Sequence, residues 1–124
     1  MEDISLDPKY AGVIGQKFRT GEDLWAIGVT SDVNYAKKVA YIVLVPGVGF
    51  SGPEVVSRER IQEGFVICIV GVLRARSVLA SNVEYVVEEV GTQRFKDSPI
   101  RVTQTGPVED GNLGLNNSIF RRVD

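Results

Sequence analysis

Short runs of β-branched and aromatic residues, spaced between glycines and prolines, constrain the fold of this chain more than any other feature. The 124 residues include 13 glycines and 5 prolines. Three of the runs between them are "LWAIGVT" (24–30), "VAYIVLV" (39–45) and "FVICIVGVLRA" (65–75). Apolar runs of this length that are bounded by turn residues are typical of β-strands. The sequence therefore predicts a mainly β protein.

Weaker patterns add further strands. In "NVEYVVEEV", Val83, Tyr85 and Val87 alternate with more polar positions, as expected for a strand with one buried face. Further strands are expected at 11–20, 82–90, 99–105 and 118–123. Segment 53–62 is the candidate helix, because Pro53 suits a first helical position. Strands spaced about 8–12 residues apart favour a small antiparallel β-barrel or sandwich, OB-like or SH3-like in style, with at most one short helix.

The length of the chain predicts a single domain. Residues 1–10 are mostly polar and are expected to form a flexible N-terminal lead-in, with a β-rich domain over 11–124. The chain is 44% hydrophobic with a net charge of −2, which is typical of a folded, soluble protein. No run approaches the roughly 20 apolar residues of a transmembrane helix. No signal peptide is visible, so the protein is expected to be periplasmic or exported if a leader was removed, and cytoplasmic otherwise.

The absence of histidine and the single cysteine argue against an enzyme. Histidine is the commonest proton carrier and metal ligand near neutral pH, so its absence excludes Ser-His-Asp and Cys-His catalysis. Cys68 lies in an apolar run without a nearby base, which indicates an inert, buried thiol. We therefore predict no catalytic residues, no cofactor and no metal site.

The glycine loop "VPGVGFSG" raises the question of a phosphate site. Gly47, Gly49 and Gly52 have the G-x-G-x-x-G spacing of a dinucleotide-binding loop after a strand. That site also needs a helix beginning at the loop and a carboxylate about 20 positions on. There is no carboxylate between Glu63 and Glu84, and Glu54 would repel a phosphate at the start of the helix. A structural turn is the favoured interpretation, and the phosphate site is kept as an alternative.

The arginines suggest a second alternative. Arg58 and Arg60 precede a strand that ends with Arg74 and Arg76. More distant cations could converge with them if the strands bring them together: Arg94, Lys96, Arg101, Arg121 and Arg122. Such a surface could bind single-stranded nucleic acid, although aromatic residues for base stacking are sparse nearby.

The leading hypothesis is a non-enzymatic interaction module that binds another protein through loops held by a rigid sheet. An envelope-associated inhibitor or immunity-type protein of a bacterium is one concrete form. The alternatives are a nucleotide or other phosphate-ligand binder, which would add Arg74 and Arg76 to the glycine loop, and a single-stranded nucleic-acid binder. The candidate residues for a ligand or partner are Gly47, Gly49, Phe50, Gly52, Glu54, Arg58, Arg60, Arg74 and Arg76.

Overall fold

The computed structural model describes residues 2–30, 39–47, 52–76, 81–95, 98–103, 115 and 118–123. Within them the chain forms nine strands and one turn of 3-10 helix, η1. In chain order, the elements are β1 (Glu2–Asp3), η1 (Pro8–Tyr10), β2 (Lys17–Thr20), β3 (Leu24–Val29), β4 (Tyr41–Val45), β5 (Val55–Ile61), β6 (Val66–Arg76), β7 (Ser81–Glu89), β8 (Ile100–Thr103) and β9 (Phe120–Val123).

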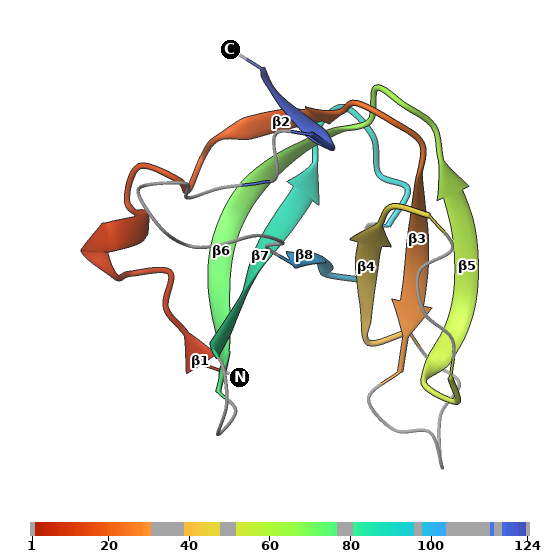
Figure 1. Cartoon of the computed structure of the whole chain (residues 1–124), viewed down its shortest axis with the longest axis horizontal. Helices are drawn as coiled ribbons and strands as arrows, with labels where there is room; N and C mark the ends of the chain where they lie inside the picture. Colours follow the sequence, from red (N-terminus) through yellow and green to blue (C-terminus); the bar gives the residue numbers. More distant parts are fainter. Residues whose placement is uncertain are drawn as a thin grey trace.

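All nine strands belong to one sheet with the order β5-β3-β4-β8-β7-β6-β2-β9, and β1 pairs with β6. Figure 1 shows the sheet curled into an arch, with β3, β4 and β5 in one leg and β6 and β7 in the other. The mainly β prediction is confirmed. The closed barrel or two-sheet sandwich is wrong, because one sheet ends in two different strands, β5 and β9, that do not pair with each other. The sheet is also mixed rather than antiparallel, since β8 runs parallel to β4.

The candidate helix over 53–62 does not form. Its residues form a turn at Pro53 and Glu54 and then strand β5, which pairs along its length with β3. The β-branched Val55 and Val56 favour an extended backbone, and the neighbouring strand supplies the backbone partners that a short helix would otherwise make itself. The described residues therefore contain no α-helix. Their one helical element, the 3-10 turn η1, is too short to cross a bilayer.

A long two-stranded ribbon, formed by the segment from β2 to β3 and the segment from β5 to β6, connects the two legs of the arch. β3 pairs with β5, and β2 pairs with β6 in the same antiparallel sense. Thr20 joins the two ladders: its N–H donates to the Phe65 carbonyl at 2.9 Å, and its Oγ1 accepts from the N–H groups of Gly64 and Phe65 at 3.0 Å each. Thr20 therefore keeps the two segments of the ribbon hydrogen-bonded where the ribbon bends.

The main core lies on one face of this sheet, which we call the inner face. Leu24 and Ile61 come from one leg, while Ile67, Ile69 and Tyr85 come from the other, and all five are almost completely buried. The outer face carries a smaller apolar cluster of Ile27, Val29 and Val43 over β3 and β4. Alternation along each strand explains both clusters, because neighbouring residues point to opposite faces.

The N-terminal segment is part of this domain, although we expected residues 1–10 to form a lead-in outside it. Glu2 and Asp3 pair with β6, and Ile4 donates a backbone hydrogen bond to the Val72 carbonyl. Tyr10, on η1, is almost fully buried in the main core. The apolar Ile4 and Tyr10 thus fix a segment whose other side chains are mostly exposed.

Candidate functional site

Strands β2 and β9 place three cations on the outer face. β2 alternates strictly, with Phe18 and Thr20 buried and Lys17 and Arg19 exposed. On β9, Phe120 is buried and Arg121 is exposed. The buried residues fix which way each strand faces, so the cations must point outward. We call Lys17, Arg19 and Arg121 the β2–β9 basic face.

The register brings two of these cations together. Arg19 pairs directly with Arg121, and Lys17 pairs with Val123. Directly opposed residues on neighbouring strands have Cβ atoms about 4.5–5.5 Å apart. Lys17 lies two residues from Arg19, which is about 7 Å along the strand. Three positive charges therefore share a small area of a protein whose net charge is −2.

No ion pair within the described residues neutralises this basic face. Other arginines do have carboxylate partners: Arg60 pairs with Asp23 at 2.5 Å, Arg94 with Glu59 at 2.5 Å and Arg101 with Glu84 at 3.7 Å. Like charges directly opposite each other on a sheet are unfavourable by up to about 1 kcal/mol. An anion from outside the chain would relieve this repulsion.

A shallow pocket of about 600 Å³ lies between the two arginines. Its lining residues are Arg19, Thr20, Gly21, Glu63, Gly64, Val66 and Arg121. The hydrogen bond from the Gly64 N–H to the Thr20 Oγ1 holds two of these lining residues together. Glu63 is exposed on the same lining and makes no ion pair with either arginine, so it weakens the attraction for an anion without removing it.

The backbone of this pocket depends on two glycines. Gly21 donates a hydrogen bond to the Ile119 carbonyl, and a Cβ at Gly21 would meet that oxygen at 3.1 Å and the Arg121 Nε at 3.3 Å. Gly64 has φ +97°, a conformation that residues with a side chain rarely adopt. The close approach of the end of β2 to the start of β9 therefore needs glycine at position 21, and the turn before Phe65 favours glycine at position 64.

The next cation on β9 faces the other way. Arg122 pairs with the buried Phe18, so it belongs to the inner face, yet it is exposed because β9 is the last strand of the sheet. Charged residues that point inward on a terminal strand discourage edge-to-edge association. Arg121 and Arg122 thus have the same charge and neighbouring positions but different surroundings.

The structure does not bring the predicted site residues together. Gly47, with φ +68°, follows β4, while Gly52 and Glu54 precede β5. Gly49 and Phe50 lie outside the described residues. Because Val55–Ile61 is a strand, the helix required by a dinucleotide-type loop does not begin at Gly52.

The predicted arginines are also dispersed. Arg58 and Arg60 lie on β5, where Arg60 binds Asp23. Arg74 lies on β6, in the opposite leg of the arch in Figure 1, where it pairs with Glu2 of β1, and Arg76 ends β6. The curl of the sheet, which no local pattern encodes, separates these two pairs.

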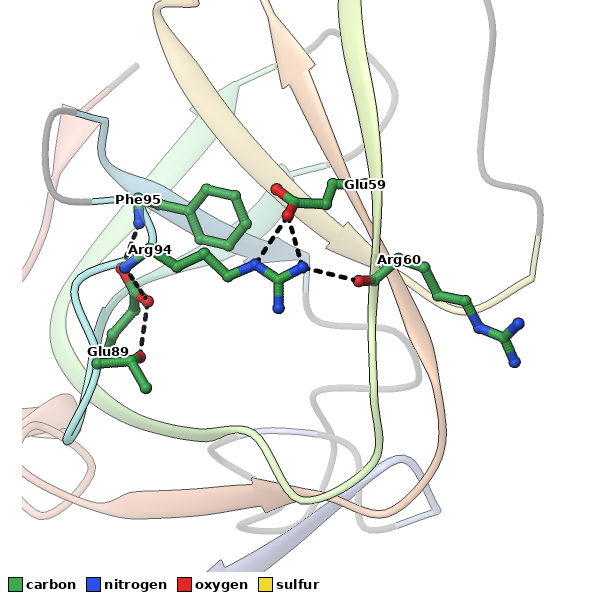
Figure 2. A network of polar contacts seen from close by, with 6 residues as sticks. Glu59, Arg60, Glu89, Arg94 and Phe95 are labelled. Atoms are coloured by element: carbon green, nitrogen blue, oxygen red, sulfur yellow. Dashed lines mark hydrogen bonds and ion pairs between the residues drawn. The ribbon is translucent and has the colours of Figure 1, made fainter.

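Figure 2 shows a second polar cluster, on the connection between β7 and β8. The Arg94 guanidinium donates to the Glu59 carboxylate and, at 3.2 Å, to the Arg60 carbonyl on β5. The Glu89 carboxylate accepts from the backbone N–H groups of Arg94 and Phe95. The guanidinium of Arg94 and the carboxylates of Glu59 and Glu89 all have partners within the cluster. The cluster therefore holds the β7–β8 connection in place and is not a candidate ligand site.

Cys68 is not the buried thiol that the sequence suggested. It is half-buried on the outer face, between Lys17 on β2 and Glu88 on β7, and its Sγ lies 3.8 Å from the Ile69 carbonyl. The alternation of β6 places Ile67 and Ile69 in the core and Cys68 on the opposite side. Within the described ranges, no group of three Cys, Asp or Glu residues could hold a metal ion.

Sequence reasoning missed Lys17 and Arg19, although it included Arg121 and Arg122 among scattered cations. The alternation in "KFRT" was a usable signal, because it places Lys17 and Arg19 on one face of a strand. The pairing of β2 with β9, about a hundred residues apart in the sequence, carried no local signal. Comparisons of the chain with protein-family models, curated proteins and solved structures found no match.

Proposed function

We propose that this protein is a non-enzymatic interaction module that binds an acidic protein partner through the β2–β9 basic face. The observation that carries the proposal is the directly opposed Arg19–Arg121 pair, which has no carboxylate partner within the described chain. A carboxylate from a partner would accept charge-assisted hydrogen bonds from both guanidinium groups. Binding would therefore replace a repulsion with two attractions.

Several features favour a protein over a nucleic acid. The basic face holds three cations, whereas many nucleic-acid-binding proteins contact about 6–10 phosphates. None of the residues that line the pocket is aromatic, so nothing in it could stack on a base. The net charge of −2 would also repel a long polyanion. An inhibitor or immunity-type protein is one form of such a module, because it acts by binding alone.

Selection from a displayed library of random peptides tests the proposal. Peptides are selected on the wild-type protein, and their affinities are then measured by fluorescence anisotropy. We expect acidic peptides whose affinity falls at least about tenfold on Arg121→Glu, since hydrogen bonds to charged groups contribute about 1.5–3 kcal/mol. Lys9→Glu, on η1, makes the same charge change away from the site and is expected to leave the affinity unchanged.

Two further measurements sharpen the test. Glu63→Gln removes the carboxylate of the pocket lining and is expected to raise the affinity a few-fold. A labelled oligothymidine and a panel of nucleotides serve as competing probes. The proposal is contradicted if no acidic peptide is selected, if Arg121→Glu and Lys9→Glu weaken binding equally, or if oligothymidine binds through Arg19 and Arg121.

A further inference from the structure

Strand β9 ends the sheet, so it has one edge that pairs with no strand in the described part of the chain. Its other edge pairs with β2 from Phe120 to Val123. A terminal strand presents backbone N–H and C=O groups in the pattern that an added strand requires. Extended peptides bind many domains in this way, with backbone hydrogen bonds for affinity and side chains for specificity.

We infer that the partner adds an extended segment to the free edge of β9, and that two consecutive acidic residues in that segment are recognised. This inference rests on the proposed function, because it uses the same basic face. Directly paired residues on neighbouring strands share a face of the sheet. A residue paired with Arg121 therefore lies on the outer face beside Arg121, with Arg19 on the far side of that arginine, and the next residue of the partner pairs with Arg122 on the inner face.

The ends of β9 extend the pattern. Phe120 is buried, and Val123 is half-buried on the outer face. Residues paired with these two positions would lie against apolar surface, which favours β-branched or aromatic side chains. The segment recognised thus has the pattern apolar–acidic–acidic–apolar. This pattern reads the same in both directions, so it fits a parallel or an antiparallel addition.

The charges on β9 also argue against a second copy of this chain as the occupant. Two β9 strands paired edge to edge would place Arg121 and Arg122 of one copy against the same cations of the other. Like charges opposite each other destabilise such a pair. The same two arginines therefore oppose self-association and favour an acidic partner, which is how repulsive and attractive elements together produce specificity.

A synthetic peptide with the central sequence Val-Glu-Glu-Val, flanked by threonines and capped at both ends, is the probe. Three matched peptides are compared with it. The first has two glutamines in place of the glutamates. The second separates the glutamates by one threonine, which places both carboxylates on the same face. The third carries N-methyl groups at alternate residues, which removes the N–H donors of one edge.

We expect the Glu-Glu peptide to bind at least tenfold more tightly than each of the three matched peptides. Arg122→Gln should weaken the Glu-Glu peptide but not a peptide whose only glutamate pairs with Arg121. Lys9→Gln, away from β9, should change neither affinity. Amide hydrogen exchange at Phe120 and Arg122 should slow when the peptide is bound, because their N–H groups lie on the edge that the added strand covers, whereas those of Arg121 and Val123 face β2.

Two results would overturn strand addition: equal binding of the N-methylated peptide, or equal binding of the peptide with separated glutamates. The outcome is distinguishable from failure of the proposed function. If these synthetic peptides fail while library-selected acidic peptides still depend on Arg121, the partner binds the basic face without adding a strand. If the library also yields no acidic peptide, both the inference and the proposed function fail.

Discussion

Asp23 shows how one carboxylate holds the corner beside the basic face. Its Oδ1 accepts a hydrogen bond from the Glu63 N–H at 2.8 Å, and its Oδ2 lies 2.5 Å from the Arg60 guanidinium. The Glu63 N–H, and then the Arg60 guanidinium, lower the pKa of Asp23 below its usual value of 3.8. Asp23 therefore fixes the backbone of Glu63, which lines the pocket between Arg19 and Arg121.

This pKa gives the stability of the protein a defined pH dependence. Because the pKa of Asp23 is lower in the folded state, its contribution is complete above pH 3.8 and is lost as the pH falls through the folded-state pKa. Asp23→Asn should therefore be less stable than wild type at neutral pH, and the difference should shrink below pH 3.8. Urea unfolding followed by circular dichroism at several pH values measures it.

The neighbouring Glu22 provides the control. Its side chain accepts no hydrogen bond within the described residues, so Glu22→Gln should change the free energy of unfolding by less than about 0.5 kcal/mol. A difference between Asp23→Asn and wild type that stayed constant from neutral to strongly acid pH would refute the role given to this carboxylate.

At the scale of elements, the connection between β7 and β8 is held by Glu89. Its Oε1 accepts from the Thr92 hydroxyl and the Arg94 N–H at 2.8 Å each, and its Oε2 accepts from the Phe95 N–H at 2.6 Å. Figure 2 shows Arg94 reaching from this connection to Glu59 on β5. Glu89 thus positions a contact between this connection and β5, a strand that lies far from β7 in the strand order.

We expect Glu89→Ala to lower the free energy of unfolding by about 1–3 kcal/mol, because three donors lose their charged acceptor. Glu59→Gln removes only an exposed ion pair and should cost about 0–1 kcal/mol. The two effects should not be additive in a double-mutant cycle, since Arg94 links them. Glu88→Ala, at an exposed neighbouring position, is the control; equal effects of Glu88→Ala and Glu89→Ala would contradict this account.

For the whole molecule, the main core joins both legs of the arch. Leu24 and Leu44 from one leg share a cluster with Ile67, Tyr85 and Phe120 from the rest of the sheet. The parallel contact between β4 and β8 is short, with two paired positions, so the shared core and the continuous ribbon provide most of the connection. Neither leg has a separate inner-face core of its own.

The protein should consequently unfold in one cooperative step. Trp25, the single tryptophan, lies on β3 and reports on one leg, while far-UV circular dichroism reports on the whole sheet. Urea transitions followed by the two signals should coincide in midpoint and slope. A Trp25 fluorescence change at clearly lower urea concentration would show that the leg containing β3, β4 and β5 unfolds independently.

The local sequence determined most of the strands. The runs at 24–30, 39–45, 65–75 and 82–90 correspond to β3, β4, β6 and β7 within one or two residues, because period-two alternation and turn glycines act over short distances. The sequence did not identify the strand within segment 53–62, because the apolar residues of this segment fit both a weak helix and a strand. Pairing with β3 decided between them.

The tertiary structure alone decided the arrangement of these strands and the candidate site. The exposed positions of Lys17 and Arg19 could be predicted from alternation, but their position beside Arg121 could not. Strand order depends on which distant segments bury each other's apolar faces, and this burial is a property of the whole chain. The same cause separated Arg60 from Arg74 and placed Arg19 opposite Arg121.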